Sequence, residues 1–309
     1  MLRSFFIALS TNKAFRAFSE RSAMGRRVSR RFVAGMSVEE AIAATEQLNA
    51  EGIDATLDSL GESVLLVSQA EESAAIYHRL LDEIAARGLR ANVSVKLTQV
   101  GMDIGGHGAG PDLAERIVGE MVEHAAAMSN FVRIDMEGSD YTEATIAMTE
   151  RLHTKWPNAV GTVLQAYLFR TANDIERLVA QGIRIRLCKG AYKEPAEIAF
   201  PAKQDVDENY VKLMKRVATS GVFCGIATHD ETIVAEMERF VAETGLDKRA
   251  FEFQMLYGVR RDLQRKLVAK GFGVRVYVPF GTEWYPYFMR RLAERPANVL
   301  FLAKNFFRN

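Results

Sequence analysis

The chain has 309 residues, of which 48% are hydrophobic and 26% charged, the balance of a soluble globular protein with ample core. This composition excludes disordered, collagen-like and low-complexity proteins, and because no apolar run approaches 18 residues we expect no membrane-spanning helix. The formal net charge is only +1, and the length fits either one large domain with an appendage or two ordinary domains.

The first 31 residues are strongly basic. They carry eight Lys and Arg side chains against the single acid Glu20, a local balance of +7, so the other 278 residues together carry −6. Phe and Leu residues are interspersed with these charges, which predicts an amphipathic arm. The arm can lie on anionic lipid or pack its Phe side chains on the main domain, and both readings stay open. Nucleic-acid binding is not expected, because the body of the chain is acidic.

From residue 54 onward, short β-branched runs alternate with amphipathic helical stretches, about one pair every thirty residues. The predicted strands are 55–58, 93–97, 131–135, 161–165, 183–187, 223–227, 251–254 and 274–278. The predicted helices are 71–86, 112–128, 142–155, 171–181, 204–219, 232–243 and 260–270.

Eight such units over about 250 residues predict an α/β fold of the (β/α)8 TIM-barrel type. A doubly wound sheet is disfavoured, because no Gly-x-Gly-x-x-Gly turn follows the first strand. We expect residues 1–53 to form a helical arm or cap and residues 54–309 the barrel, with a C-terminal helix at 297–309 over the barrel mouth.

Cysteines and histidines give little sign of metal or disulfide chemistry. Cys188 and Cys224 are too few for a disulfide framework and favour a reducing cytoplasm. The five histidines show no His-x-His or His-Glu-x-x-His spacing, so a zinc site is not expected.

Polar or ionisable residues end all eight predicted strands, and active sites of such barrels lie at those ends. We therefore expect an active site there rather than a set of solvated strand ends. The residues are Asp58, Lys96, Asp135 with Glu137, Gln165, Arg186 with Lys189, His229 with Asp230, Gln254 and Tyr277.

Several roles are open for these side chains. Asp135 needs a cationic partner such as Lys96, and the pair could equally be a salt bridge that only fixes the barrel mouth. Lys96 and Lys189 could each serve as a Schiff-base nucleophile, as in barrel aldolases. The glycine after Lys189 exposes backbone N–H groups that could hold phosphate, with Thr228 and His229 from the next strand.

The segment 285–292, YPYFMRRL, predicts a helix after the eighth strand, with Pro286 in its first turn. Arg290 and Arg291 could form a bidentate carboxylate clamp if this helix crosses the barrel mouth. The alternative is a solvated arginine pair, because adjacent helical residues point about 100° apart.

Eight motifs follow one another along the chain: SVKLT (94–98), IDME (134–137), LQAYL (164–168), RLCKGAY (186–192), ATHD (227–230), FEFQMLYG (251–258), VYVPFG (276–281) and YFMRR (287–291). In this order they make the chain resemble the FAD-dependent proline dehydrogenase family, in its monofunctional bacterial form. The resemblance covers residues 93–307.

The resemblance implies oxidation of L-proline to Δ1-pyrroline-5-carboxylate by hydride transfer to flavin N5, with electrons passed to a membrane quinone. It makes Asp135 and Arg186 catalytic, with Arg186 near the flavin. Substrate-binding residues would be Lys96, Leu256, Tyr277, Tyr287, Arg290 and Arg291, and FAD-binding residues Met136, Gln165, Arg186, Lys189, Gly190, Ala191, Thr228 and His229.

The implied partners are L-proline, the quinone and a pyrroline-5-carboxylate dehydrogenase that takes over the product. We expect a cytoplasmic protein, with peripheral membrane contact through the basic arm. Two other readings are kept: a lysine-dependent barrel aldolase, and a barrel that binds lipid or a protein partner without catalysis.

Overall fold

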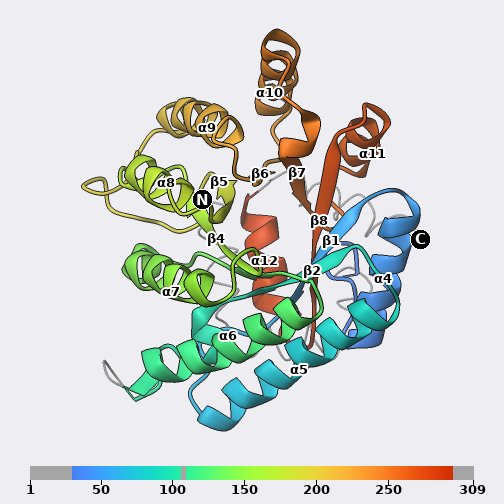
Figure 1. Ribbon diagram of the computed structural model, residues 1–309, viewed down its shortest axis with the longest axis vertical. Coiled ribbons are helices and arrows are strands. Elements are labelled where there is room, and N and C mark those ends of the chain that lie inside the picture. Colours follow the sequence, from blue (N-terminus) through green and yellow to red (C-terminus); the bar gives the residue numbers. More distant parts are fainter. Residues whose placement is uncertain (1–29, 106–108, 295–309) are drawn as a thin grey trace.

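The eight β-branched runs form eight parallel strands that close into a barrel in the computed structural model, which describes residues 30–105 and 109–294 (Figure 1). Closure is made by the first and last strands, which pair in parallel with Thr56 opposite Tyr277. The strands are β1 (Asp54–Ser59), β2 (Ala91–Val95), β3 (Val132–Ile134), β4 (Val160–Gln165), β5 (Arg184–Cys188), β6 (Cys224–Ala227), β7 (Phe251–Leu256) and β8 (Gly273–Phe280).

Helices alternate with the strands and surround the barrel (Figure 1), which confirms the predicted (β/α)8 architecture. No helix within the described ranges has the length and apolar character needed to span a bilayer. The helices are α4 (Val38–Ala50), α5 (Val67–Ala86), α6 (Ala109–Ala127), α7 (Thr142–Lys155), α8 (Thr171–Val179), α9 (Lys203–Ala218), α10 (Glu231–Thr244), α11 (Arg261–Ala269) and α12 (Trp284–Glu294), with short 3₁₀ turns η1 (Leu97–Val100), η2 (Ser139–Tyr141) and η3 (Lys248–Ala250).

The main hydrophobic core lies between the strands and the surrounding helices. In β5, Ile185 and Leu187 are buried in this core, whereas Arg184 and Arg186 alternate with them and line the barrel interior. The strands therefore carry an aliphatic outer face and a polar inner face.

The polar inner face extends further than the sequence predicts. Thr56, Asn92 and Arg275 lie well before the ends of their strands, and Arg133 lies one residue before the end of β3, yet all four line one cavity inside the barrel. The polar residues of this barrel therefore extend beyond the strand ends at which the sequence predicts the active site. Buried polar side chains can occupy the interior because they hydrogen-bond one another, as Thr56 and Asn92 do at 2.7 Å.

Two helices complete the barrel: α4 precedes β1 and stands outside the regular alternation, whereas α12 follows β8 as its last helix. The first, α4, contacts β1 and β8, where the sheet closes. The last, α12, buries Trp284, Tyr285 and Phe288 in a separate cluster with Leu60, which follows β1, and Val259, which follows β7. A helix therefore covers the carboxyl-terminal mouth of the barrel on this side (Figure 1).

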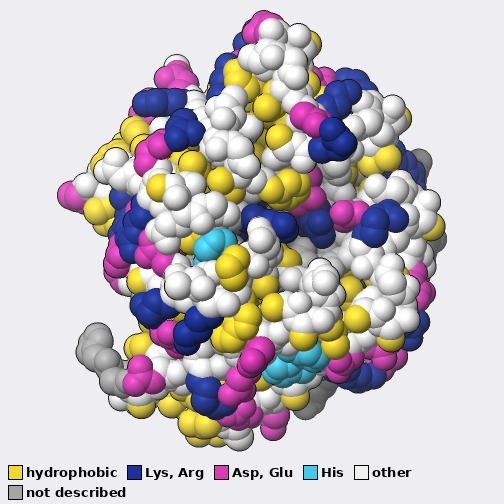
Figure 2. Space-filling model, in the orientation of Figure 1, with side chains coloured by type: hydrophobic (Ala, Val, Ile, Leu, Met, Phe, Trp, Pro, Cys, Tyr) yellow, Lys and Arg dark blue, Asp and Glu magenta, His cyan; other side chains and the backbone are white. Residues whose placement is uncertain are grey.

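The predicted terminal segments fall largely outside the described residues. These include most of the basic arm and the helix expected at 297–309. The division at residue 53 into arm and barrel accordingly stays a prediction. Figure 2 shows cationic and acidic side chains gathered near the centre of the molecular face, within the ring of helices.

Candidate active site

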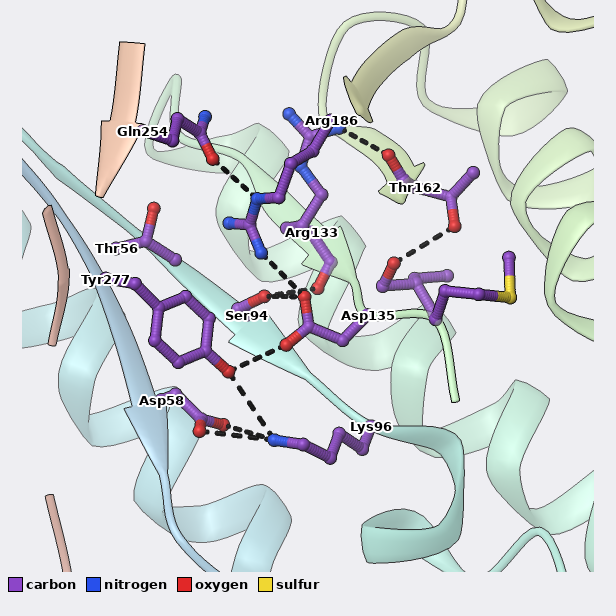
Figure 3. Close-up of polar contacts among 12 residues, drawn as sticks. Thr56, Asp58, Ser94, Lys96, Arg133, Asp135, Thr162, Arg186, Gln254 and Tyr277 are labelled. Atoms are coloured by element: carbon purple, nitrogen blue, oxygen red, sulfur yellow. Dashed lines mark hydrogen bonds and ion pairs between the residues drawn. The ribbon is translucent and has the colours of Figure 1, made fainter. Parts of the chain in front are cut away.

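The site is centred on the Asp135 carboxylate, directly after β3. Its Oδ1 accepts hydrogen bonds from Ser94 Oγ at 2.7 Å and Arg186 Nη1 at 2.8 Å, and its Oδ2 accepts one from the Tyr277 hydroxyl at 2.7 Å (Figure 3). Burial alone would raise the pKa of Asp135, but the charges of Arg186 and Lys96 outweigh burial and hold this pKa below its ordinary value. Asp135 is therefore ionised and joins side chains from β2, β5 and β8.

Lys96 lies beside this group, immediately after β2. Its Nζ is 3.1 and 3.2 Å from the two carboxylate oxygens of Asp58 and 3.5 Å from the Tyr277 hydroxyl (Figure 3). Glu62 Oε1 lies 3.9 Å from the same Nζ. Burial lowers the pKa of the Lys96 ammonium, but the charges of Asp58 and Glu62 outweigh it, so the pKa lies well above its ordinary value. Lys96 is therefore a firmly held cation, unlike the neutral amine that a Schiff-base nucleophile must supply.

Asp58 is enclosed by a second set of polar groups on its far side. The hydroxyl of Tyr77, a fully buried residue of α5, lies 3.5 Å from Asp58 Oδ1 and 3.0 Å from Gln99 Oε1, and Gln99 donates to the Ser59 carbonyl at 2.7 Å. Burial raises the pKa of Asp58 to about 6 in spite of the opposing charge of Lys96. Asp58 is thus mainly ionised at neutral pH and takes up a proton when the pH falls to about 6.

Arg186 is fixed on two sides. Beyond its contact with Asp135, its Nε donates to Gln254 Oε1 at 2.5 Å, and Gln254 Nε2 donates to Glu252 Oε1 at 2.6 Å. Its guanidinium carbon lies 5.3 Å from the centre of the Tyr277 ring, within range of a cation–π contact. Arg186 consequently has one orientation, set by four side chains of three other segments.

Gln165 and Met136 lie at the neighbouring ends of β4 and β3. Gln165 Nε2 donates to the carbonyls of Met136 at 3.3 Å and Glu137 at 2.9 Å. Gln165 is 3% exposed, and its Oε1 has no hydrogen-bond partner within the described part of the chain. A buried acceptor of this kind points to a donor group that binds beside it.

The loop after β5 holds Lys189, Gly190 and the exposed Ala191. Lys189 Nζ is 2.5 Å from Asp207 and 2.9 Å from Asp230, so carboxylates of α9 and of the loop before α10 fix it. Gly190 has φ +119°, and a Cβ there would meet the Tyr167 ring at 2.4 Å. Only glycine lets the backbone lie against that ring.

Thr228 and His229 follow β6 and are held by backbone groups. The Thr228 hydroxyl accepts from the Asp230 N–H at 3.1 Å, and His229 Nε2 accepts from the Leu256 N–H at 2.8 Å. His229 Nε2 is therefore unprotonated, and the imidazole ties the end of β6 to the end of β7.

The remaining predicted substrate residues belong to α12 and to the end of β7. Tyr287 is buried in the cluster beneath α12, and Leu256 packs against that cluster. Arg290 and Arg291 lie within α12, but their side chains are outside the described residues, so the carboxylate clamp stays a prediction.

The structure thus joins Lys96, Tyr277, Asp135 and Arg186 in one chain of contacts. It places the predicted flavin residues and Leu256 at or just after adjoining strand ends, and Tyr287, Arg290 and Arg291 in α12. Sequence reasoning gave no role to Ser94, although it alternates with Lys96 and so shares its inward direction. Asp58 and Gln254 were recognised only as polar strand ends. No sequence signal marks Tyr77, because it reaches the barrel from a helix.

Comparison with known proteins identifies the family. The family model described as "Proline dehydrogenase" matches residues 41–304, which is most of the chain. The chain belongs to the proline dehydrogenase family. "Proline dehydrogenase 1" of Bacillus subtilis is 40% identical over 305 residues, 98% of each chain, and "Proline dehydrogenase" of Deinococcus radiodurans is 42% identical over 280 residues, 90% of this chain and 89% of that one.

A solved structure supports the fold of this proline dehydrogenase family member. Proline utilization A from Bdellovibrio bacteriovorus, inactivated by N-propargylglycine, superposes with a TM-score of 0.82 at 22% identity. The match covers 95% of this chain and 36% of that one, so the chain spans about a third of that protein.

Proposed function

We propose that this protein oxidises L-proline to Δ1-pyrroline-5-carboxylate with FAD as its cofactor and passes the electrons to a membrane quinone. This reaction is the first step of proline catabolism to glutamate. The observation that carries the proposal is the buried cluster in which Asp135 holds Arg186 and Tyr277 beside Lys96, at the mouth of a barrel of the proline dehydrogenase family.

The charges of the cluster support binding of an amino-acid carboxylate near α12. Asp58 and Asp135 offset Lys96 and Arg186, and Glu62 lies 3.9 Å from Lys96, so the described cluster has no excess of positive charge. A buried substrate carboxylate needs further positive charge. The paired residues 290–291 in α12 can supply it, because this helix covers the same mouth of the barrel.

The same cations favour the reactive form of the substrate. Proline must lose its ammonium proton, because the nitrogen lone pair is needed to form the C5=N bond as C5 loses hydride. Lys96 and Arg186 disfavour a further positive charge beside them and so favour the neutral amine. Tyr277 and Leu256 form walls on either side of the substrate ring, and Asp135 orients Tyr277.

The residues at the ends of β3 to β6 fit FAD. The buried Gln165 Oε1 accepts no hydrogen bond from the described residues, which suits an N–H of the isoalloxazine ring, and the backbone at Gly190 lies close against Tyr167. FAD supplies the acceptor for the hydride that leaves the substrate. Residues that would hold FAD are Met136, Gln165 and Arg186 on the ring side, and Lys189, Gly190, Ala191, Thr228 and His229 on the phosphate side.

The deciding experiment is anaerobic titration of the purified protein with L-proline. A yellow protein with bound flavin that bleaches on addition of L-proline, but not of D-proline, is the expected result. A colourless preparation that borohydride inactivates only with a carbonyl substrate would instead identify a lysine-dependent aldolase. A colourless and unreactive protein would support the binding barrel.

The basic arm supports a peripheral location on the cytoplasmic face of the membrane, where the quinone is found. Its +7 balance suits anionic headgroups, and nucleic acid is not a proposed partner. A pyrroline-5-carboxylate dehydrogenase would take over the product.

A further inference from the structure

The polar cavity inside the barrel lies on the amino-terminal side of Arg186 and away from α12. Its volume is about 50 Å³, enough for one small ion but not for a nucleotide or an amino acid. The strand residues that line it are Thr56, Asn92, Arg133, Arg184, Arg186, Glu252, Gln254 and Arg275, with Phe131 and Phe223 at its edge.

The cavity has an excess of positive charge. Four arginines line it but only one carboxylate, that of Glu252, which bonds Arg275 Nε at 2.6 Å. Two further carboxylates reach these arginines from outside the cavity: Asp54 contacts Arg275 at 3.1 Å, and Asp135 contacts Arg186 at 2.8 Å. Arg275 contacts two of these carboxylates and Arg186 the third, and Asp54 is shared with the exposed Arg90 at 2.9 Å, so the cavity keeps an excess of positive charge.

That excess lies on Arg133 and Arg184, neither of which forms an ion pair within the described residues. Arg133 is 4% exposed, and its Nη1 donates to the carbonyls of Thr162 at 2.9 Å and Arg184 at 2.8 Å. Its buried Nε has no hydrogen-bond partner in the described part of the chain. A guanidinium keeps its charge in proteins, so this burial is unfavourable unless an anion or a polar molecule contacts it.

The residues around Arg133 and Arg184 suit a compact ligand. Gly161 leaves room for Arg133, because a Cβ at this glycine would lie 2.9 Å from Arg133 Nη1. Phe131 faces both guanidinium groups, 4.6 Å from that of Arg133 and 5.3 Å from that of Arg184. Arg184 and Phe223 are only partly buried, so the cavity can be reached from the amino-terminal end of the barrel.

We propose that this cavity binds a monovalent inorganic anion of chloride size, held by Arg133 and Arg184. One such ion offsets this excess positive charge and fits the volume. It accepts a hydrogen bond from Arg133 Nε and stabilises the folded barrel.

The direct test is a crystal of the full chain soaked in bromide and measured at the bromine absorption edge. The expected result is an anomalous peak inside the cavity, within hydrogen-bond range of Arg133 and Arg184. A cavity that holds only water, with no bromide at any concentration the crystal tolerates, overturns the proposal.

A solution test separates specific binding from general salt effects. At constant ionic strength, replacing gluconate with chloride should raise the midpoint of thermal unfolding by about 2–4 °C in a saturable way. Arg184→Met should abolish this difference, whereas Arg249→Met should keep it, because Arg249 is a 90% exposed arginine outside the cavity. A chloride effect that is equal in both variants, or absent from the parent protein, contradicts the site.

Discussion

Lys96 and Asp58 form a buried ion pair between neighbouring strand ends, with Nζ 3.1 and 3.2 Å from the two carboxylate oxygens. The pair lies within reach of the Tyr277 hydroxyl and so of the Asp135 cluster. While Asp58 is ionised, it offsets much of the positive charge that Lys96 offers to an anionic ligand. The protonation state of Asp58 should therefore control how strongly a substrate carboxylate binds.

Because the protonation state of Asp58 controls carboxylate binding, the affinity for such ligands should depend on pH. The pKa of Asp58 is raised to about 6, so Asp58 is charged above this pH and neutral below it. Tetrahydrofuran-2-carboxylate, which keeps the carboxylate and lacks the amine, should bind more tightly as the pH falls through 6. We expect a gain of roughly tenfold, equivalent to a one-unit change of the Asp58 pKa on binding. Spectroscopic titrations at a series of pH values measure it.

Two variants show which carboxyl group causes this pH dependence. Asp58→Asn should bind the analogue tightly at all these pH values, because Lys96 then lacks its nearest carboxylate. Glu137→Gln is the matched control: burial also raises the pKa of Glu137, but its carboxylate bonds Thr98 rather than Lys96. If Asp58→Asn keeps the pH dependence and Glu137→Gln loses it, Glu137 is the group responsible.

The Tyr277 hydroxyl should matter for turnover more than for folding. Tyr277→Phe removes the 2.7 Å hydrogen bond to Asp135 and the contact with Lys96. Hydrogen bonds to charged groups contribute about 1.5–3 kcal/mol, so kcat/KM for proline should fall by about 10- to 150-fold. Tyr141→Phe is the control, since its hydroxyl also bonds a carboxylate, Asp103, but at the surface. Comparable losses in both variants would refute a specific role.

The proposed clamp in α12 predicts a selective loss of carboxylate binding. Arg291→Met should weaken proline binding by roughly 30- to several-thousand-fold, because truncating a desolvated ion pair costs about 2–5 kcal/mol. FAD content should stay unchanged. Pyrrolidine, which has the amine but no carboxylate, should be a poor substrate of the parent protein and lose far less in the variant. Parallel losses for proline and pyrrolidine would mean that the arginine only maintains the structure.

The backbone at Gly190 should be needed to hold FAD. Gly190→Ala introduces a Cβ that would meet the Tyr167 ring at 2.4 Å, at a φ of +119° that alanine rarely adopts. We expect a marked drop in the flavin-to-protein ratio of the purified protein. Gly182→Ala is the matched control, with φ +75° and no atom within 4 Å of its Cβ. It should lose about 1 kcal/mol of stability from backbone strain and keep its flavin.

The basic arm should contribute to membrane binding and not to chemistry. Deleting residues 1–29 leaves Phe32 and Val33, which are buried in the cluster beneath α12. Binding to anionic vesicles should weaken in a salt-sensitive manner, since each basic residue near such a surface contributes about 1 kcal/mol. Flavin reduction by proline should continue. Undiminished vesicle binding would show that the arm is a structural element only.

The architecture could be predicted because its signals are local. The helix Thr142–Lys155 begins and ends where its periodicity does, and each predicted strand overlaps an observed one. The ends of the strands were predicted less accurately than their positions. The sequence predicts a strand over 93–97, but β2 ends at Val95 and the 3₁₀ turn η1 starts at Leu97. Apolar periodicity does not show where ladder hydrogen bonds stop.

The site was predictable only where a strand end and a family motif coincide, as at Lys96 and Asp135. Tyr77 was missed because a helical pattern shows that this side chain is buried, not that its hydroxyl reaches Asp58. Asp207, one of the two carboxylates that contact Lys189, was missed for a related reason. Asp207 belongs to α9, and only the fold brings that helix to the end of β5.

The hydrogen bond between Tyr277 and Asp135 joins residues 142 positions apart, and Tyr277 belongs to the strand that closes the barrel. During synthesis, strands β1 to β7 leave the ribosome before β8 does. At that stage Asp135 lacks its hydrogen bond from Tyr277, and β1 lacks its pairing with β8. The active site is therefore completed late, when β8 joins the barrel. Separating the gene between β4 and β5 would likewise divide Asp135 from Arg186, so two co-expressed half-barrels would regain turnover only by reassembling. Turnover would then serve as a reporter of barrel assembly.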